Sequence, residues 1–117
     1  MSEPYSTALI NKALELATQL KIELKSGVYL ALQGPTFETL AEYKMVKAIG
    51  ADCVGMSTVP EVIVARHMDL KCFGISVITD MGDEENIDEV NHKEVLEAAK
   101  KAEPHVRNLI KNLIIRS

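Results

Sequence analysis

The chain alternates amphipathic segments with short apolar runs, and this order constrains its fold more than any other feature of the sequence. The apolar runs cover residues 28–32, 52–54 and 71–79, and they have the character of buried strands. Helical periodicity occupies the stretches around and between them. This alternation predicts α/β architecture, with mainly parallel strands covered by helices on both faces. Three short strands leave unprotected edges, so we expect them to be part of a larger sheet.

Four segments show the 3.6-residue periodicity of helices that bury one face. They cover residues 7–24, 38–49, 59–67 and 92–115. The predicted inward residues are Leu9, Ile10, Ala13, Leu16, Ala17 and Leu20 in the first helix, and Leu40, Ala41, Met45, Val46 and Ile49 in the second. Gly50 is expected to follow the second helix as its C′ residue, and Thr58 to precede the third as its N-cap. Pro104 is expected to kink or interrupt the last helix.

The composition is that of one small folded domain. The chain has 117 residues, of which 47% are hydrophobic and 26% are charged. A formal net charge of −4, no basic run and 4% aromatic residues argue against a nucleic-acid-binding surface. No apolar run approaches the length of a membrane span, and residues 1–4 show no signal peptide, so no membrane partner is expected. Cys53 and Cys72 form no C-x-x-C pair, which indicates buried free thiols and a cytoplasmic protein.

Polar side chains follow each of the three predicted strands. Glu38 comes after the first strand, Ser57 after the second, and Asp80, preceded by Thr79, after the third. Ligands of open α/β sheets bind just beyond the carboxyl ends of the strands, so one crevice could collect all three strand ends. Carboxylates in such a crevice accept hydrogen bonds from N–H donors, of which a heteroaromatic base offers several.

Each of these side chains also has a purely structural interpretation. Glu38 could be a first-turn carboxylate that favours the helix dipole. Ser57 and Thr58 could serve only to cap the helix that follows them, and Met56 could belong to the core. Asp80 could be an aspartate that opens a turn.

The histidines and the sequence motifs suggest no metal or dinucleotide site. His92, near the start of the last helix, is either exposed, a cap or functional, whereas His67 and His105 are interpreted as structural. No pair of histidines has metal-ligand spacing, and no Cys/His cluster is present, so no metal is expected. The chain has no G-x-G-x-x-G, P-loop or G-x-S-x-G motif, which argues against dinucleotide, P-loop and α/β-hydrolase chemistry.

Several stretches of the sequence resemble one enzyme family. Residues 34–39 read GPTFET, and residues 55–67 read GMSTVPEVIVARH. The other matching positions are Gly50-Ala51-Asp52, Ile78-Thr79-Asp80 and Asn91-His92. Together these stretches closely resemble the C-terminal half of purine nucleoside phosphorylase of the trimeric type, and the resemblance covers nearly the whole chain. The family converts a purine nucleoside and phosphate into a free purine and ribose 1-phosphate.

The resemblance implies a three-layer α/β fold with a mainly parallel or mixed central sheet. Residues 1–117 would form a single domain, the C-terminal portion of that fold, which is therefore incomplete. The resemblance implies purine salvage by a glycosyltransferase, with phosphate as co-substrate and no other cofactor. The implied partners are a purine nucleoside and phosphate, together with a homo-oligomer (a trimer in the family) or a separate N-terminal half.

The resemblance assigns two of the strand-end residues to the purine base. Glu38 would accept hydrogen bonds from the pyrimidine edge, and Phe37 would pack against the base. Asp80, with Thr79 beside it in the substrate-binding set, would bond to the base near N7. A donor at N7 stabilises the negative charge that develops on the departing purine. Glu38 and Asp80 are therefore the catalytic candidates.

Four further residues are assigned to the ribose and the phosphate by the same resemblance. Tyr29 and Met56 would line the ribose side of the site. Ser57 would contact phosphate, and His92 would reach the ribose 5′-hydroxyl.

Asp80 departs from the family pattern. Members specific for 6-oxopurines typically have asparagine at its position. A branch that cleaves methylthioadenosine has aspartate there, but lacks the Phe-Glu-Thr that this chain keeps at residues 37–39. Guanosine and inosine are therefore the expected substrates, and the choice between a 6-oxo and a 6-amino purine stays open.

The second departure is that the chain has no equivalent of the family's N-terminal half. That half carries the glycine-rich phosphate loop, an arginine and a histidine that bind phosphate, and an aromatic residue lent by a neighbouring subunit. We therefore expect a family fragment that is inactive alone. Two other hypotheses are a non-catalytic purine-binding or interaction module and a degenerate fragment without function.

Overall fold

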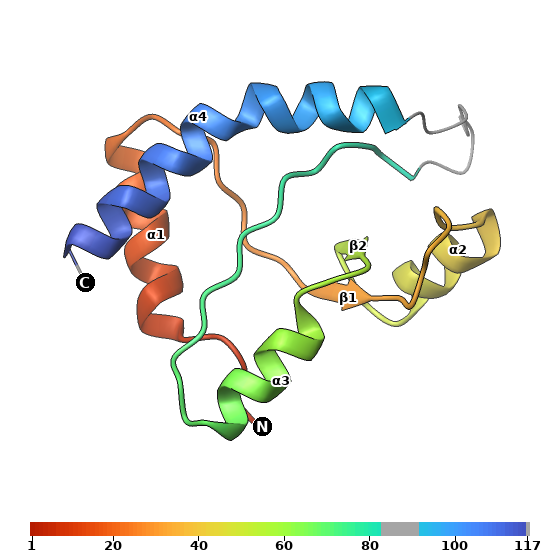
Figure 1. The fold of residues 1–117 in the computed structure, drawn as a ribbon, viewed down its shortest axis with the longest axis horizontal. Coiled ribbons are helices and arrows are strands. Elements are labelled where there is room, and N and C mark those ends of the chain that lie inside the picture. Colours follow the sequence, from red (N-terminus) through yellow and green to blue (C-terminus); the bar gives the residue numbers. More distant parts are fainter. Residues whose placement is uncertain (83–91, 117) are drawn as a thin grey trace.

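Helices and strands follow one another in the order α1–β1–α2–β2–α3–α4 (Figure 1). The computed structural model describes residues 1–82 and 92–116. The elements are α1 (Thr7–Gln19), β1 (Tyr29–Ala31), α2 (Leu40–Ala48), β2 (Cys53–Gly55), α3 (Val59–His67) and α4 (His92–Arg116). The order confirms the expected α/β architecture, with two strands in place of three in the part of the chain that is described.

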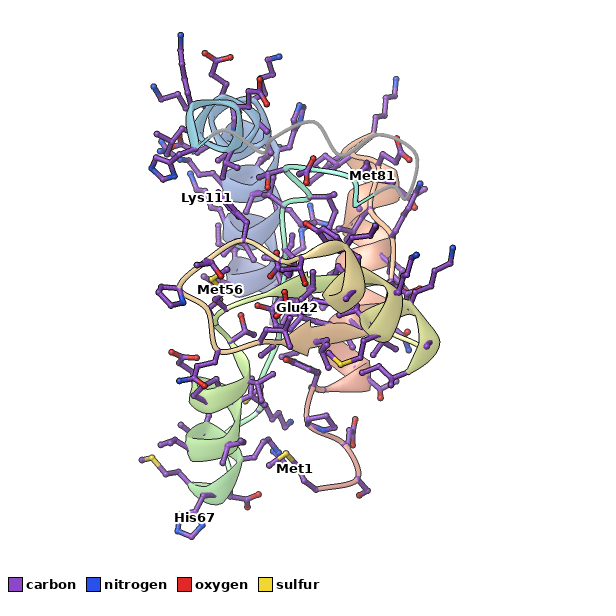
Figure 2. The ribbon with its side chains drawn as sticks, turned by 90° about the vertical axis from the view of Figure 1, so that its right-hand side faces the viewer. Met1, Glu42, Met56, His67, Met81 and Lys111 are labelled. Carbon is purple, nitrogen blue, oxygen red and sulfur yellow. The ribbon has the colours of Figure 1, made fainter. Side chains whose placement is uncertain are left out.

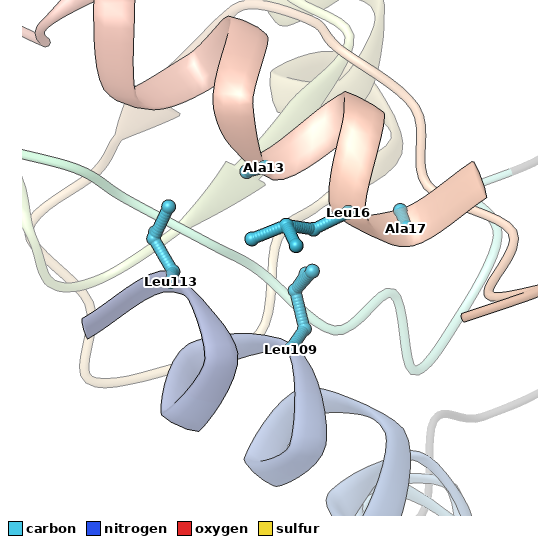
Figure 3. Close-up of a cluster of buried hydrophobic side chains, with 5 residues drawn as sticks. All are labelled: Ala13, Leu16, Ala17, Leu109 and Leu113. Carbon is cyan, nitrogen blue, oxygen red and sulfur yellow. The ribbon is translucent and has the colours of Figure 1, made fainter. Parts of the chain in front are cut away.

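The main hydrophobic core joins the two ends of the chain. Its buried residues come from α1 and α4 and are Ala13, Leu16, Ala17, Leu109 and Leu113 (Figure 3). They recur at three- and four-residue spacing, as facing apolar stripes of two packed helices do. Lys12 on α1 donates a hydrogen bond to the carbonyl of Arg116, whose guanidinium donates to Gln19 at 3.1 Å. The predicted inward face of the first helix is thus confirmed at its centre.

α1 ends at Gln19, so the prediction of a helix to residue 24 is wrong. Lys21 has a φ of 56°, which a right-handed helix does not contain. The N–H of Ile22 bonds back to the carbonyl of Ala17 at 2.8 Å, which closes the helix end in a Schellman pattern. Ile22 and Leu24 extend the apolar periodicity because they pack on the same core from irregular chain.

The two strands are parallel and in register. Leu30 of β1 pairs with Val54 of β2, and the strands begin and end together. Asp52 holds their starting ends, because its carboxylate accepts a hydrogen bond from the Val28 N–H at 2.7 Å. The carboxyl ends of both strands therefore open onto the same edge.

The strand predicted over residues 71–79 is not formed. This segment crosses the middle of the molecule as irregular chain (Figure 1), and its carbonyl at Cys72 accepts a hydrogen bond from the Ser6 N–H at 2.8 Å. An apolar run becomes a strand only when a neighbour pairs with its backbone. Within the described residues, β1 and β2 pair only with each other, so the run has no ladder.

α2 differs from its prediction, whereas the kink expected in α4 is confirmed. α2 begins at Leu40 rather than at residue 38, and only Val46 on it is buried. Met45 and Ile49 were predicted to face inward, but their side chains are 45% and 62% exposed because no described element covers that face. α4 continues through Pro104 without interruption and changes direction partway along its length (Figure 1), as expected of a helix containing proline.

Candidate functional site

The loops that follow β1 and β2 lie against each other. The Leu32 N–H donates to the Gly55 carbonyl at 2.8 Å, which extends the pairing beyond β1. Gly34 has a φ of 70°, and a Cβ placed on it would lie 2.5 Å from the sulfur of Met56. The first two predicted strand ends are therefore brought together, and Met56 packs beneath the loop that leads to Glu38.

Tyr29 connects the start of β1 to Ser57, the second residue after β2. Its hydroxyl accepts a hydrogen bond from the Ser57 N–H at 3.2 Å. Its ring crosses Gly55 so closely that a Cβ there would lie 2.4 Å from the hydroxyl oxygen. Two residues predicted to lie on the ribose and phosphate side of the site are thus in direct contact.

Thr58 gives the turn after Ser57 an unusual backbone. Its φ of 76° and ψ of −52° are strained for a β-branched residue, typically at a cost of about 1–3 kcal/mol. The Val59 N–H donates to the Ser57 carbonyl at 2.8 Å across this turn. The Thr58 side chain makes no cap hydrogen bond, and its hydroxyl lies 3.1 Å from that of Ser57. Thr58 occupies the predicted N-cap position, but the interpretation of these two hydroxyls as helix caps is wrong.

Glu38 lies two residues before α2 and not in its first turn. Thr39 is the N-cap, and Glu42 forms a capping box with it, accepting from the Thr39 N–H at 2.6 Å and from its hydroxyl at 2.8 Å. These bonds lower the pKa of Glu42 below its ordinary value. Because Glu42 takes the first-turn role, the interpretation of Glu38 as a carboxylate serving the helix dipole is wrong.

Tyr43, on α2, lies within reach of the charges of both Glu38 and Asp80. The pKa of Tyr43 is raised above its ordinary value, and burial is the largest cause. The negative charges of Glu38 and Asp80, a hydrogen bond with Glu38 and the charge of Glu42 raise this pKa further, in decreasing order. A Cβ placed on Gly82 would lie 2.6 Å from the Tyr43 ring, so the segment after Asp80 rests on that ring. The third predicted strand end therefore reaches the first without forming a strand.

Tyr43 is a residue that no sequence motif indicated. The signal available was that it is the sole aromatic residue in the helix that follows Glu38. An aromatic side chain with a polar tip near a candidate carboxylate is well suited to orient it.

The remaining candidates are exposed or half-buried. Phe37 is 47% exposed, Asp80 is exposed and Thr79 is half-buried. His92 is exposed at the first residue of α4, and its predicted role toward ribose stays a prediction. His67, interpreted as structural, is exposed at the far end of α3 (Figure 2).

Two hollows border the turn at Thr58. The larger, of about 870 Å³, lies between α1, α4 and the chain around residues 21–29 and 73–78. The smaller, of about 430 Å³, is lined by Ser57, Glu61, Cys72 and neighbouring residues. Glu38 and Asp80 line neither of these two hollows.

The arrangement suits hydrogen bonding to an organic ligand. Two carboxylates and one phenol offer acceptors and a donor near one sheet edge, and hydroxyls follow β2 at the same edge. Among residues 1–82 and 92–116, no group of three His, Cys, Asp or Glu side chains is arranged to hold a metal ion. No helix in the described part of the chain has the length and apolarity to cross a membrane.

Comparison with known proteins reveals close relatives. Residues 1–115 match the sequence family described as the phosphorylase superfamily. Purine nucleoside phosphorylase of Mus musculus is 49% identical over 106 residues, covering 87% of this chain and 37% of the mouse protein. Isoform 2 of purine nucleoside phosphorylase from Schistosoma mansoni, solved with cytosine and ribose 1-phosphate, superposes with a TM-score of 0.94 at 37% identity. That match covers 98% of this chain and 42% of the other.

A second Schistosoma mansoni structure, of purine nucleoside phosphorylase with inosine, superposes with a TM-score of 0.91 at 33% identity. It covers 97% of this chain and 41% of that one. The chain therefore spans about two-fifths of the length of the relatives it matches.

Proposed function

The chain belongs to the phosphorylase superfamily and is a homologue of the purine nucleoside phosphorylases, and on this basis we propose that it forms the base- and ribose-binding half of a site for purine nucleoside phosphorolysis. In that reaction phosphate displaces the purine from C1′ of ribose, giving the free base and ribose 1-phosphate. One observation carries the proposal: Tyr43 interacts with Glu38 and senses the charge of Asp80, and its ring lies against Gly82, so the two carboxylates that would contact the base lie near the same side chain. The inosine and the ribose 1-phosphate bound by relatives of the same fold support it.

The proposed chemistry follows from the charges that develop when the glycosidic bond breaks. The ribose becomes positive and the purine becomes negative. Glu38 accepts hydrogen bonds from the N–H groups of the pyrimidine edge. Asp80, when protonated, donates to N7 as an amide would, and this bond strengthens as the purine gains charge. Phe37 packs on the base, while Tyr29, Met56 and His92 contact the ribose.

Asp80 bears on which purine is used. An ionised Asp80 repels a purine anion but accepts a hydrogen bond from a 6-amino group. A protonated Asp80 resembles asparagine and suits a 6-oxopurine. We propose inosine and guanosine as the main substrates, because Phe37, Glu38 and Thr39 keep the signature that accompanies 6-oxopurine recognition.

The described residues provide few hydrogen-bond donors for phosphate. Ser57 offers a hydroxyl before the N-terminus of α3, which favours an anion. Arg66 lies at the other end of α3, where its guanidinium donates to the Leu70 carbonyl at 2.8 Å. A phosphate dianion is normally held by several converging donors. We therefore propose that a polypeptide equivalent to the unmatched part of the relatives supplies the rest.

The openness of the chain supports the need for such a polypeptide. Its accessible surface is 8975 Å², whereas a compact monomer of 12.9 kDa exposes about 6,300 Å². Its radius of gyration is 15.4 Å, against about 13 Å for a compact domain of this length. The unpaired run at residues 71–79 and the 870 Å³ hollow would accept strands from a separate N-terminal half or from a homo-oligomer.

A non-catalytic purine-binding module is the second candidate. Two carboxylates are available to bind a base, whereas only Ser57 and a helix N-terminus are available, among the described residues, to bind phosphate. This difference favours base binding without phosphorolysis. A degenerate fragment would bind no base at all.

Reconstitution separates these candidates. The 117-residue chain is assayed with inosine, guanosine and phosphate, alone and mixed with the N-terminal portion of the mouse relative. We expect no turnover by the chain alone and turnover by the mixture, abolished by Glu38→Ala. Base binding without turnover in the mixture would favour the binding module. The absence of both base binding and turnover would contradict the proposal.

A further inference from the structure

Tyr43 contacts both parts of the base side of the proposed site. Its hydroxyl hydrogen-bonds with Glu38 and lies within the electrostatic reach of Asp80. Its ring lies against the backbone of Gly82, where a Cβ would approach ring atoms to between 2.6 and 3.0 Å. One side chain thus joins Glu38, which precedes the N-cap of α2, to the chain that follows Asp80.

The start of α2 holds Tyr43 in place. The Tyr43 N–H donates to the carbonyl of Thr39 at 3.0 Å, in the first turn that the Thr39–Glu42 capping box stabilises. Glu38 lies on one side of this N-cap and Tyr43 on the other. The helix start therefore fixes the backbone positions of Glu38 and Tyr43 relative to each other.

A carboxylate that is held by one donor is better prepared to bind a second. Glu38 belongs to an irregular segment, and its side chain would otherwise lose rotamer freedom when a ligand binds. A hydrogen bond from Tyr43 removes part of that loss before the ligand arrives, while the carboxylate keeps unused acceptor sites.

We propose that Tyr43 is a positioning residue that orients the Glu38 carboxylate for the purine and holds residues 80–82 against α2. The inference rests on the proposed function, because the ligand it prepares for is the purine base. Tyr43 itself takes no part in bond breaking.

The first test measures the contact between Tyr43 and Glu38 without any ligand. The chain carrying tyrosine labelled with carbon-13 at Cζ gives three resonances, which single Tyr→Phe variants assign. At neutral pH, Glu38→Gln is expected to shift the Tyr43 resonance and to leave that of Tyr5 in place. Glu15→Gln, an exposed change on α1, is the matched control and should shift neither. An unmoved Tyr43 resonance in Glu38→Gln overturns the inference.

The second test measures hypoxanthine binding by the 117-residue chain and by its mixture with the N-terminal portion of the mouse relative. Tyr43→Phe removes one hydroxyl and is expected to weaken binding about tenfold, or about 1.4 kcal/mol. Tyr5→Phe, the matched control, should bind as the unmodified chain does. Equal binding by Tyr43→Phe overturns the inference while leaving the proposed function intact. If the unmodified chain binds no hypoxanthine in either form while the Tyr43 resonance still responds to Glu38→Gln, the proposed function has failed and the positioning role falls with it.

Discussion

The Tyr29 hydroxyl oxygen and the Ser57 backbone nitrogen lie 3.2 Å apart, so a side chain at the start of β1 holds the turn that follows β2. The contact is possible because Gly55 leaves room for the ring to cross β2. Ser57, the proposed phosphate contact, is thereby fixed by Tyr29, the proposed ribose contact.

Gly55→Ala is expected to break this contact. The new Cβ would lie 2.4 Å from the Tyr29 oxygen, so the ring must move, at a cost of about 1–3 kcal/mol. Urea unfolding should show the lost stability, and hydrogen exchange should show faster exchange at the Ser57 amide. Gly50→Ala is the control, because Gly50, the predicted C′ residue of α2, has a φ of 87° and no atom within 4 Å of an added Cβ. Gly50→Ala should lower the stability only because alanine is strained at this positive φ, and it should leave the exchange rate of the Ser57 amide unchanged. The same exchange rate at the Ser57 amide in both variants would contradict the predicted loss of the Tyr29 contact.

Glu38→Ala is expected to weaken guanine or hypoxanthine binding in the reconstituted mixture by about 2–4 kcal/mol, because it removes a charged acceptor from the edge of the base. Isothermal titration measures the affinity, and Glu15→Ala, on the exposed side of α1, serves as the control. A loss of less than about threefold, or 0.7 kcal/mol, would show that Glu38 does not recognise the base.

Asp80→Asn is expected to raise inosine cleavage relative to adenosine cleavage in the same mixture. The amide donates to N7 without needing a proton from solvent, and it no longer offers an ionised acceptor to a 6-amino group. The readout is the ratio of the two kcat/KM values. An unchanged ratio would count against a role for Asp80 in base choice.

The capping box predicts how stability depends on acid. Hydrogen bonds from Thr39 lower the pKa of Glu42 in the folded state below its ordinary value of 4.5. As the pH falls toward 4.5, the Glu42 carboxylate therefore becomes protonated in the unfolded chain before it does so in the folded chain. The stabilisation is present above that value and is lost as the pH falls through the lowered pKa. Denaturant unfolding between about pH 5 and about pH 3 should therefore show a steeper loss for the unmodified chain than for Glu42→Gln. Parallel losses would show that Glu42 makes no such contribution.

The exposed apolar surface predicts self-association of the purified chain. The side chains of Ile49, Val64 and Ile78 are each more than half exposed, and the run at residues 71–79 has no strand partner among the described residues. Sedimentation velocity should reveal species that grow with concentration and decline when the N-terminal portion of a relative is added. A monomer at all concentrations would contradict this expectation.

Local patterns predicted much of the fold. The four helices, the first two strands, the α/β class and the parallel direction of the strands follow from periodicity and from turn residues close in sequence, whereas the third predicted strand is absent from the described residues. The resemblance to the phosphorylases rested on contiguous residues and is supported by the family match over residues 1–115. The binding roles of Glu38, Ser57, Asp80 and His92 stay predictions.

What the tertiary structure alone decided depends on residues far apart in the chain. Residues 71–79 have the composition of a strand, but a ladder needs a backbone partner, and composition does not reveal whether one is present. Ile22 and Leu24 continue a helical pattern although α1 has ended, because burial and not helix formation selects apolar residues there. Tyr43 acquires its place beside Glu38 and Gly82 only when α2 and the chain after Asp80 meet. Periodicity records which side chains are buried, whereas strand pairing and side-chain contacts depend on which distant segment arrives to cover them.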